Sequence, residues 1–172
     1  KKSKDLDRIN SFHYEEGRGF TPNITYLRND RIDFKMDMLG THSLMIYEKE
    51  FRDVRKGSWS ERFIHSLASK HIIKGTSDET FSPNNTITRA EFVAMAVRAI
   101  DSDVEVKVDF VGMDQGAWYY QELRMAKQLG LIYGEHYDAL EPINRFEMAV
   151  IASKAHAIIN NKKVEFNGTL EF

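Results

Sequence analysis

Two kinds of hydrophobic pattern divide the chain near residue 50. In residues 31–38, polar and apolar side chains alternate, which is typical of a half-buried strand. Shorter strand-like segments occur at residues 11–14, 23–27 and 43–47. After residue 50, apolar side chains recur three or four positions apart, which is typical of amphipathic helices. The pattern therefore predicts a small antiparallel β element over residues 1–50, followed by a mainly α-helical region.

The helical region contains the same unit twice. Tryptophan and glycine landmarks recur after 59 residues, and arginine and glutamate landmarks recur after 56 residues. The matched pairs are Trp59 and Trp118, Gly75 and Gly134, Arg89 and Arg145, and Glu91 and Glu147. Four landmarks in the same order indicate an internal repeat. We expect helix–loop–helix repeats over residues 51–109 and 110–169, with the length difference in a loop.

The last residues of the chain repeat the start of both units. An acidic residue followed by Phe stands at Glu50-Phe51, at Asp109-Phe110 and at Glu171-Phe172. This spacing predicts that residues 170–172 begin a third repeat, and a chance pair is the alternative. The β element of residues 1–50 is expected to be the tail of an upstream domain, or to pack on the repeats, because two or three strands rarely hold together alone.

The expected helix starts carry capping signals. Ser58 with Glu61 and Thr88 with Glu91 fit the capping box, in which a hydroxyl and a carboxylate bind orphan backbone N–H groups. Asn144 is an acceptable N-cap and Glu147 follows it at the capping-box position. Gly75 is suited to a left-handed turn after a helix. Trp59 and Trp118 begin apolar helical faces, so core packing is expected to be their main role.

Composition narrows the chemistry. The 172 residues have a net charge of −2 and no Cys, which argues against a general nucleic-acid binder and excludes disulfides and thiolate sites. No apolar run approaches the ~18 residues of a membrane span. Histidine spacing does not fit zinc, and Pro83 and Arg89 stand where a calcium loop needs Gly and Glu. We therefore expect no metal and no cofactor.

Five segments of the first repeat together resemble a known family. They are Phe51-Arg52-Asp53-Val54, Trp59, Ile72-Ile73-Lys74-Gly75, Phe81-Ser82-Pro83-Asn84 and Ile87-Thr88-Arg89-Ala90-Glu91-Phe92. With these residues the first repeat is similar to an S-layer homology (SLH) domain over its whole length, and the second is a degenerate copy in which Gly112 replaces Asp53. The resemblance implies an extracellular protein of the Gram-positive cell surface whose repeats form part of a pseudo-threefold spindle.

The resemblance also implies a non-catalytic anchor. Grooves between such repeats bind secondary cell-wall polysaccharide, typically through a pyruvylated sugar, without a cofactor or nucleic acid. The expected ligand-binding residues are Asp53, Trp59, Gly75, Arg89, Trp118, Gly134 and Arg145. An arginine at a helix start opposes the helix dipole, which suggests a partner, and its fork suits a carboxylate. The alternative is that each arginine pairs only with a neighbouring acid.

Two other functions remain open at the sequence level. Two repeats without a third expose helix faces that self-association would bury, which favours an assembly module of a surface-layer protein. A glycoside hydrolase needs a carboxylate pair, for which Glu91 and Glu147 are available, although both fit capping boxes better. A helix-turn-helix DNA binder is disfavoured because the loops of about ten residues are too long.

Overall fold

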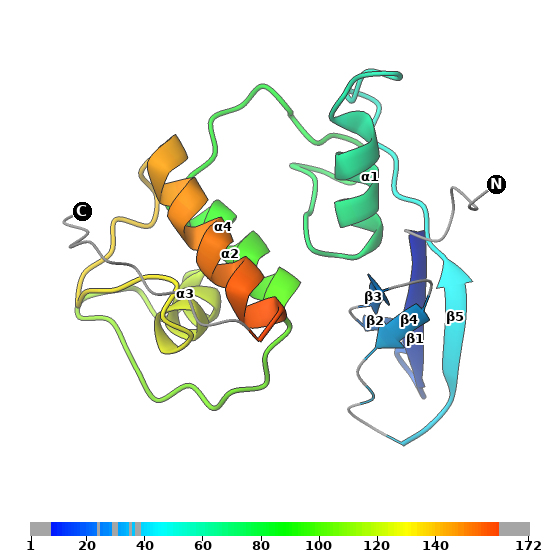
Figure 1. The fold of residues 1–172 in the computed structure, drawn as a ribbon, viewed down its shortest axis with the longest axis horizontal. Coiled ribbons are helices and arrows are strands. Elements are labelled where there is room, and N and C mark those ends of the chain that lie inside the picture. The colour runs from blue at the N-terminus through cyan, green and yellow to red at the C-terminus, as the bar shows by residue number, and fades with distance from the viewer. Residues whose placement is uncertain (1–7, 24, 29–30, 35, 37–38, 162–172) are drawn as a thin grey trace. The chain divides into compact units, whose positions relative to one another are not determined.

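The computed structural model describes residues 8–23, 25–28, 31–34, 36 and 39–161 (Figure 1). The chain forms two compact units, residues 1–85 and 86–172, so the division falls within the first expected repeat. Residues 170–172, predicted to begin a third repeat, lie outside the described residues. In the described part of the chain, no helix is both long and apolar enough to span a bilayer.

Unit 1 begins with the predicted antiparallel β element. Strands β1 (Ile9–Glu15), β2 (Gly19–Asn23) and β5 (His42–Ile46) form one sheet in the order β2-β1-β5. Strands β3 (Thr25–Arg28) and β4 (Arg31–Phe34) pair separately.

The sequence pattern did not predict β2 as a separate strand. β2 contains Pro22, which cannot donate a ladder hydrogen bond, and the strand is tolerated because it lies at the sheet edge. The predicted strand at 31–38 is described as a strand only as far as Phe34, and residues 35, 37 and 38 lie outside the description.

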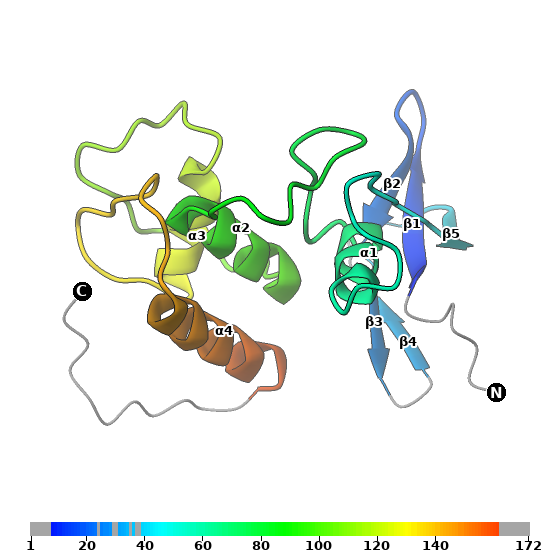
Figure 2. The same ribbon diagram turned by 90° about the horizontal axis from the view of Figure 1, so that it is seen from above.

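Helix α1 (Glu61–Ser69) lies next to the strands of unit 1 (Figure 2). The Asn10 side-chain amide on β1 donates to the Ser69 carbonyl at 2.8 Å, and Lys70 Nζ donates to the Thr25 carbonyl at 2.8 Å. These contacts satisfy carbonyls from the end of α1 and from β3. The β element therefore packs on the helix that follows it in sequence.

Aromatic side chains also join the sheet to the end of α1. The His71 ring lies 4.8 Å from the Tyr47 ring and 6.3 Å from the Phe12 ring, between centroids. Burial lowers the pKa of His71 because the charged imidazolium loses water, and Lys74 lowers it further. His71 is therefore held as a neutral aromatic side chain.

The start of α1 differs from the predicted capping box. Ser60 is the N-cap residue and its side chain makes no capping hydrogen bond. The Glu61 carboxylate accepts from the Gly57 backbone N–H at 2.6 Å, and the Ser58 carbonyl accepts from the Glu61 N–H at 3.3 Å. The roles assigned to Ser58 and Glu61 were wrong because a turn over residues 58–61 delays the helix start.

The core-packing prediction for both tryptophans was also wrong. Trp59 is 84% exposed and Trp118 is 55% exposed. Helix α3 (Tyr120–Gln128), like α1, begins two residues after its tryptophan. Each indole therefore precedes the first helical turn and lies outside the stripe that the helix buries.

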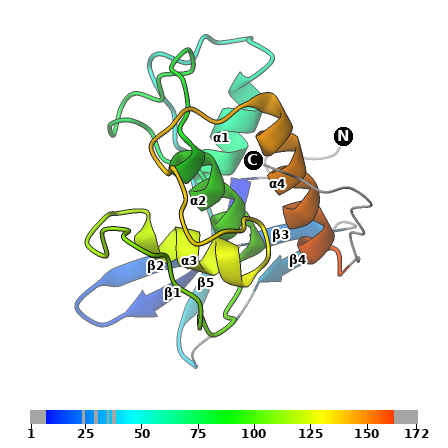
Figure 3. The same ribbon diagram turned by 90° about the vertical axis from the view of Figure 1, so that its left-hand side faces the viewer.

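Unit 2 is built around helix α2 (Arg89–Ile100), which packs against both α3 and α4 (Arg145–Ile159) (Figures 1 and 3). Val93, Leu123 and Leu131 are almost fully buried between these helices. Arg98 on α2 also pairs with Glu122 on α3 at 3.0 Å. Helix α3 begins 59 residues after α1, and α4 begins 56 residues after α2. These are the same intervals that separate the matched residues of the two repeats in the sequence.

Gly75 does not adopt the left-handed conformation that the sequence predicted. Its backbone instead lies so close to its neighbours that an added Cβ would stand 2.3 Å from the Thr80 carbonyl oxygen and 2.5 Å from the Phe51 ring. Gly75 is therefore needed for close approach of the 77–80 turn to the buried Phe51 ring. Gly134 does have a positive φ of 97°.

We predict that Gly75→Ala lowers the free energy of unfolding of unit 1 by about 3 kcal/mol, because backbone rather than a flexible side chain blocks the methyl group. Gly57→Ala is the matched control. Gly57 has a φ of 77° but nothing within 4 Å of an added Cβ, so only about 1 kcal/mol of backbone strain is expected. Hydrogen exchange of α1 amides measures both losses, and equal losses would contradict this account.

Candidate functional site

The start of α2 is held by the loop that precedes α4. The Arg89 N–H donates to the Glu141 carbonyl at 2.9 Å, and the Ala90 N–H donates to the Ala139 carbonyl at 2.8 Å. Thr88 Oγ1 accepts from the Glu91 N–H, and the predicted capping box is confirmed. The first-turn N–H groups of α2 are thus already bound within the protein. These N–H groups are therefore not free to bind an external anion.

A single carboxylate connects the two helix starts. Glu147 Oε1 accepts from Arg89 Nε at 2.8 Å and lies 2.8 Å from a terminal guanidinium nitrogen of the same arginine. Glu147 Oε2 accepts from the Asn144 N–H, and Asn144 Oδ1 accepts from the Glu147 N–H, both at 2.9 Å. Glu147 is therefore both the confirmed capping-box residue of α4 and the acidic partner of Arg89.

Both partners of this ion pair are largely removed from solvent, which reduces the screening of their attraction. The side chains of Arg89 and Glu147 are 23% and 8% exposed. The hydrogen bond that Arg89 donates to Glu147 raises the pKa of the Arg89 guanidinium, so the arginine stays charged. The sequence alternative, in which the arginine pairs with an acid of the protein, is what the structure shows for Arg89. The partner is not Glu91, which caps its own helix.

A cavity of about 350 Å³ opens beside this pair within unit 2. Its wall contains Arg89, Glu147, Leu131, Ile132, Tyr133, Gly134, His136, Tyr137, Asp138 and Ile151. Of the residues predicted from sequence, the structure brings Arg89 and Gly134 to this wall. Burial, followed by the charge of Glu147, raises the pKa of Tyr137 to about 12. The Tyr137 hydroxyl is therefore neutral and able to donate a hydrogen bond at physiological pH.

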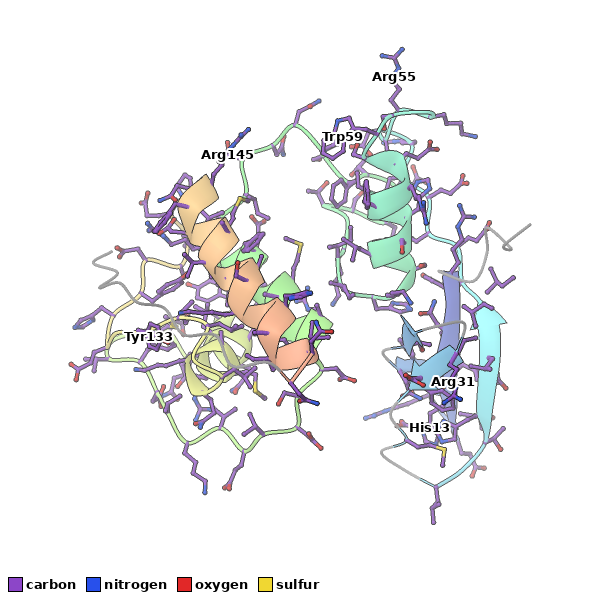
Figure 4. The ribbon with its side chains drawn as sticks, viewed as in Figure 1. His13, Arg31, Arg55, Trp59, Tyr133 and Arg145 are labelled. Atoms are coloured by element: carbon purple, nitrogen blue, oxygen red, sulfur yellow. The ribbon has the colours of Figure 1, made fainter. Side chains whose placement is uncertain are left out.

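Arg145 occupies the position in α4 that Arg89 occupies in α2. It is exposed at the helix start, and no ion pair involves it within the described residues (Figure 4). The next residue, Phe146, is 60% exposed, whereas its counterpart Ala90 is fully buried. Of the two predicted arginines, Arg145 is the one whose guanidinium is available to an external carboxylate.

The remaining predicted residues of unit 1 have different surroundings. Asp53 is exposed, and its two carboxylate oxygens accept from the Phe81 and Ser82 N–H groups at 2.8 and 2.7 Å. These backbone hydrogen bonds, that of Phe81 first, lower the pKa of Asp53. Asp53 therefore organises the loop after Gly75, while Trp59 presents a free indole at the start of α1 (Figure 4).

A backbone hydrogen bond next to Asp53 has an equivalent in the second repeat. Arg52 N–H donates to the Glu79 carbonyl in the first repeat, and Val111 N–H donates to the Glu135 carbonyl in the second, both at 2.9 Å. Gly112 stands where Asp53 would be and supplies no carboxylate. In the described part of the chain, no group of three or more His, Cys, Asp or Glu side chains could hold a metal ion.

We predict that Glu147→Ala lowers the free energy of unfolding of unit 2 by about 3 kcal/mol. The substitution removes a helix cap and leaves the half-buried Arg89 guanidinium without its acid. The control Glu91→Ala removes only an exposed capping carboxylate and should cost about 1 kcal/mol. Urea unfolding followed by hydrogen exchange of α2 and α4 amides measures both, and an equal cost would show that the Arg89 pair contributes nothing.

Comparison with known proteins relates the chain to a protein family. Residues 50–93 match the model of the S-layer homology domain. The chain is 33% identical over 144 residues to an amylopullulanase of Thermoanaerobacterium thermosulfurigenes, covering 82% of the chain and 8% of that relative. It is 32% identical over 76 residues to a cellulosome-anchoring protein of Acetivibrio thermocellus, covering 43% of the chain and 17% of the relative.

A third relative is an S-layer protein of Bacillus licheniformis. It is 27% identical over 123 residues, which cover 71% of the chain and 14% of that protein. The chain spans less than a fifth of the length of each of these three relatives. The family match and the surface-layer relatives indicate a cell-surface, cell-wall-associated location. Residues 50–93 therefore form an S-layer homology domain, and the chain belongs with the bacterial cell-surface proteins that carry such domains.

Proposed function

We propose that the chain is a non-catalytic module that anchors its protein to secondary cell-wall polysaccharide by binding a pyruvylated sugar. S-layer homology domains anchor proteins to the cell wall, and one relative is named a cellulosome-anchoring protein. The observation that carries the finer proposal is the exposed Arg145 guanidinium, which has no acidic partner within the described residues. A pyruvate ketal presents a carboxylate, which an arginine fork binds with two hydrogen bonds.

Exposed aromatic rings support a sugar as the ligand. Trp59 and Trp118 are both largely exposed at equivalent positions of the two repeats. An indole face is apolar and electron-rich, so it suits the C–H face of a sugar ring. In this proposal Gly134 lets the ligand approach the backbone of unit 2, while Asp53 and Gly75 shape the corresponding loop of unit 1.

The carboxylates do not favour a hydrolase. Glu91 Oε2 accepts from the Thr88 N–H at 2.8 Å, and Glu147 is held by Asn144 and Arg89. A general acid or nucleophile must face the scissile bond, but both of these carboxylates face the backbone of helix starts. The proposal therefore assigns no catalytic step to this segment.

We predict that the chain co-sediments with Gram-positive cell walls carrying pyruvylated polysaccharide and that Arg145→Gln weakens this binding about tenfold, the value of one charged hydrogen-bond contact. Arg55→Gln is the control, because Arg55 is also exposed but does not begin a helix. Absence of retention, or equal retention by walls from which pyruvate has been removed, would contradict the proposal.

One observation favours self-association as a second function. Trp59, Phe63 and Leu67 form a stripe along α1 and are 84%, 60% and 39% exposed. The positions in α3 that correspond to Phe63 and Leu67 are Glu122 and Ala126, and both contact α2 or the core of unit 2. The α1 stripe is thus the equivalent of a helix-packing face, and a helix of a second copy of the chain is the occupant that it fits.

We predict that self-association through this stripe is abolished by the double substitution Phe63→Asp with Leu67→Asp. Light scattering across a concentration series should show dimers for the wild type and monomers for the variant, because two charges replace the apolar contact. Tyr14→Asp, on a half-exposed residue of β1, is the control. A wild type that stays monomeric at the highest concentration would rule out this second function.

A further inference from the structure

The loop before Gly134 presents an aromatic ring at the cavity of unit 2. Tyr133 contributes to the cavity wall together with Arg89, Tyr137 and Asp138, and it is 62% exposed. Figure 4 shows Tyr133 on the loop that follows α3. A single exposed aromatic residue needs no explanation by itself. What distinguishes Tyr133 is the side chain that lies against its ring.

A buried lysine holds one face of this ring. Lys154 on α4 is only 8% exposed, and its Nζ lies 4.1 Å from the centroid of the Tyr133 ring. The same ammonium group donates to the Leu131 carbonyl at 3.2 Å. A cation over a ring face is attracted to the π electrons, and the attraction grows when water is excluded. The lysine therefore fixes both the loop backbone and the ring plane.

The far end of the ring lies near a glycine. The Tyr133 hydroxyl lies 3.7 Å from the point where a Cβ of Gly130 would stand, so the ring extends over a glycine that has a φ of 71°. With one face on the ammonium group and 62% of the residue exposed, the other face is open to a ligand. Because the ring is already ordered, binding against it costs little side-chain entropy.

This arrangement belongs to the second repeat alone. The counterpart of Tyr133 in the first repeat is Lys74, and the counterpart of Lys154 is Arg98, which pairs with Glu122 instead. The Leu131-Ile132-Tyr133-Gly134 segment otherwise matches Ile72-Ile73-Lys74-Gly75. An aromatic ring and the lysine beneath it thus replace two cations of the first repeat.

We propose that Tyr133 is an aromatic platform on which a pyranose ring of the wall polysaccharide stacks its apolar C–H face, with Lys154 as the positioning residue. The inference rests on the proposed function and adds a specific contact to it. Polar groups lie on the same cavity wall, at Asp138, His136 and Tyr137, and they suit the hydroxyl groups at the sugar rim. The ligand class is therefore a neutral or anionic pyranoside rather than a free anion.

The test compares binding of purified, protein-free Gram-positive cell walls by the whole chain and its variants. Tyr133→Ala should weaken binding about tenfold, the size of one aromatic stacking contact, and Tyr133→Phe should change it less than about twofold. Tyr14→Ala is the control, because Tyr14 is also an exposed tyrosine but lies in unit 1. Unchanged circular dichroism and thermal melting would show that each variant is folded.

Lys154 is tested by a double-mutant cycle with Tyr133. If Lys154→Met acts by releasing the ring, it should weaken wall binding in the wild type but add nothing in the Tyr133→Ala background. A purely structural role would weaken binding equally in both backgrounds and would overturn the positioning role.

The outcomes separate the two proposals. Wall binding by Tyr133→Ala that equals the wild type overturns the platform while the anchoring function stands. Failure of the wild type to bind any wall overturns the anchoring function, and the platform falls with it.

Discussion

The arrangement of unit 2 depends on the carboxylate of Glu147. One oxygen caps α4 through the Asn144 N–H, and the other binds the guanidinium at the start of α2. A charge that is 8% exposed is stable only when its lone pairs are used, and Glu147 uses both oxygens. Because the same side chain serves both helices, neither helix start is formed independently of the other. The backbone bonds from Arg89 and Ala90 to the 139–141 loop complete the junction.

The ion pair at this junction determines which of the two arginines has an exposed guanidinium. The two arginines occupy equivalent positions in the sequence, and both were predicted to bind the ligand. The structure instead pairs Arg89 with an internal acid, while Arg145 has no ion pair in the described region. Arg89 is paired because α2 packs against α3 and α4, and Glu147 of α4 contacts the guanidinium at the start of α2. The degenerate copy thus offers the exposed guanidinium and also the aromatic platform.

The structural features that depend on local sequence pattern were predicted correctly. The order of a β element and then helices, the caps at Thr88 and Asn144, and the recurring helix starts all follow from periodicity and short-range hydrogen bonding. The sequence did not predict features that depend on contacts between residues far apart in the chain. The role of Gly75 is set by Phe51 and Thr80, and the pairing of Arg89 by a glutamate 58 residues away. The exposure of Trp59 follows from a turn that shifts the helix start by two residues. Tyr133 carries no motif, and only comparison with Lys74 in the first repeat would have drawn attention to it.

The antiparallel bridge between Thr88 and Pro142 has a mechanical consequence. It joins residues 54 positions apart, so it closes a loop that contains α2 and α3. A protein attached to a wall is pulled along its backbone, and this bridge, together with the Arg89–Glu147 pair, keeps that loop from extending. If the junction opened and the loop unravelled, the tether would lengthen by up to roughly 180 Å, at about 3.3–3.6 Å per residue. The bridge and the ion pair thus hold together the two ends of the loop that contains α2 and α3.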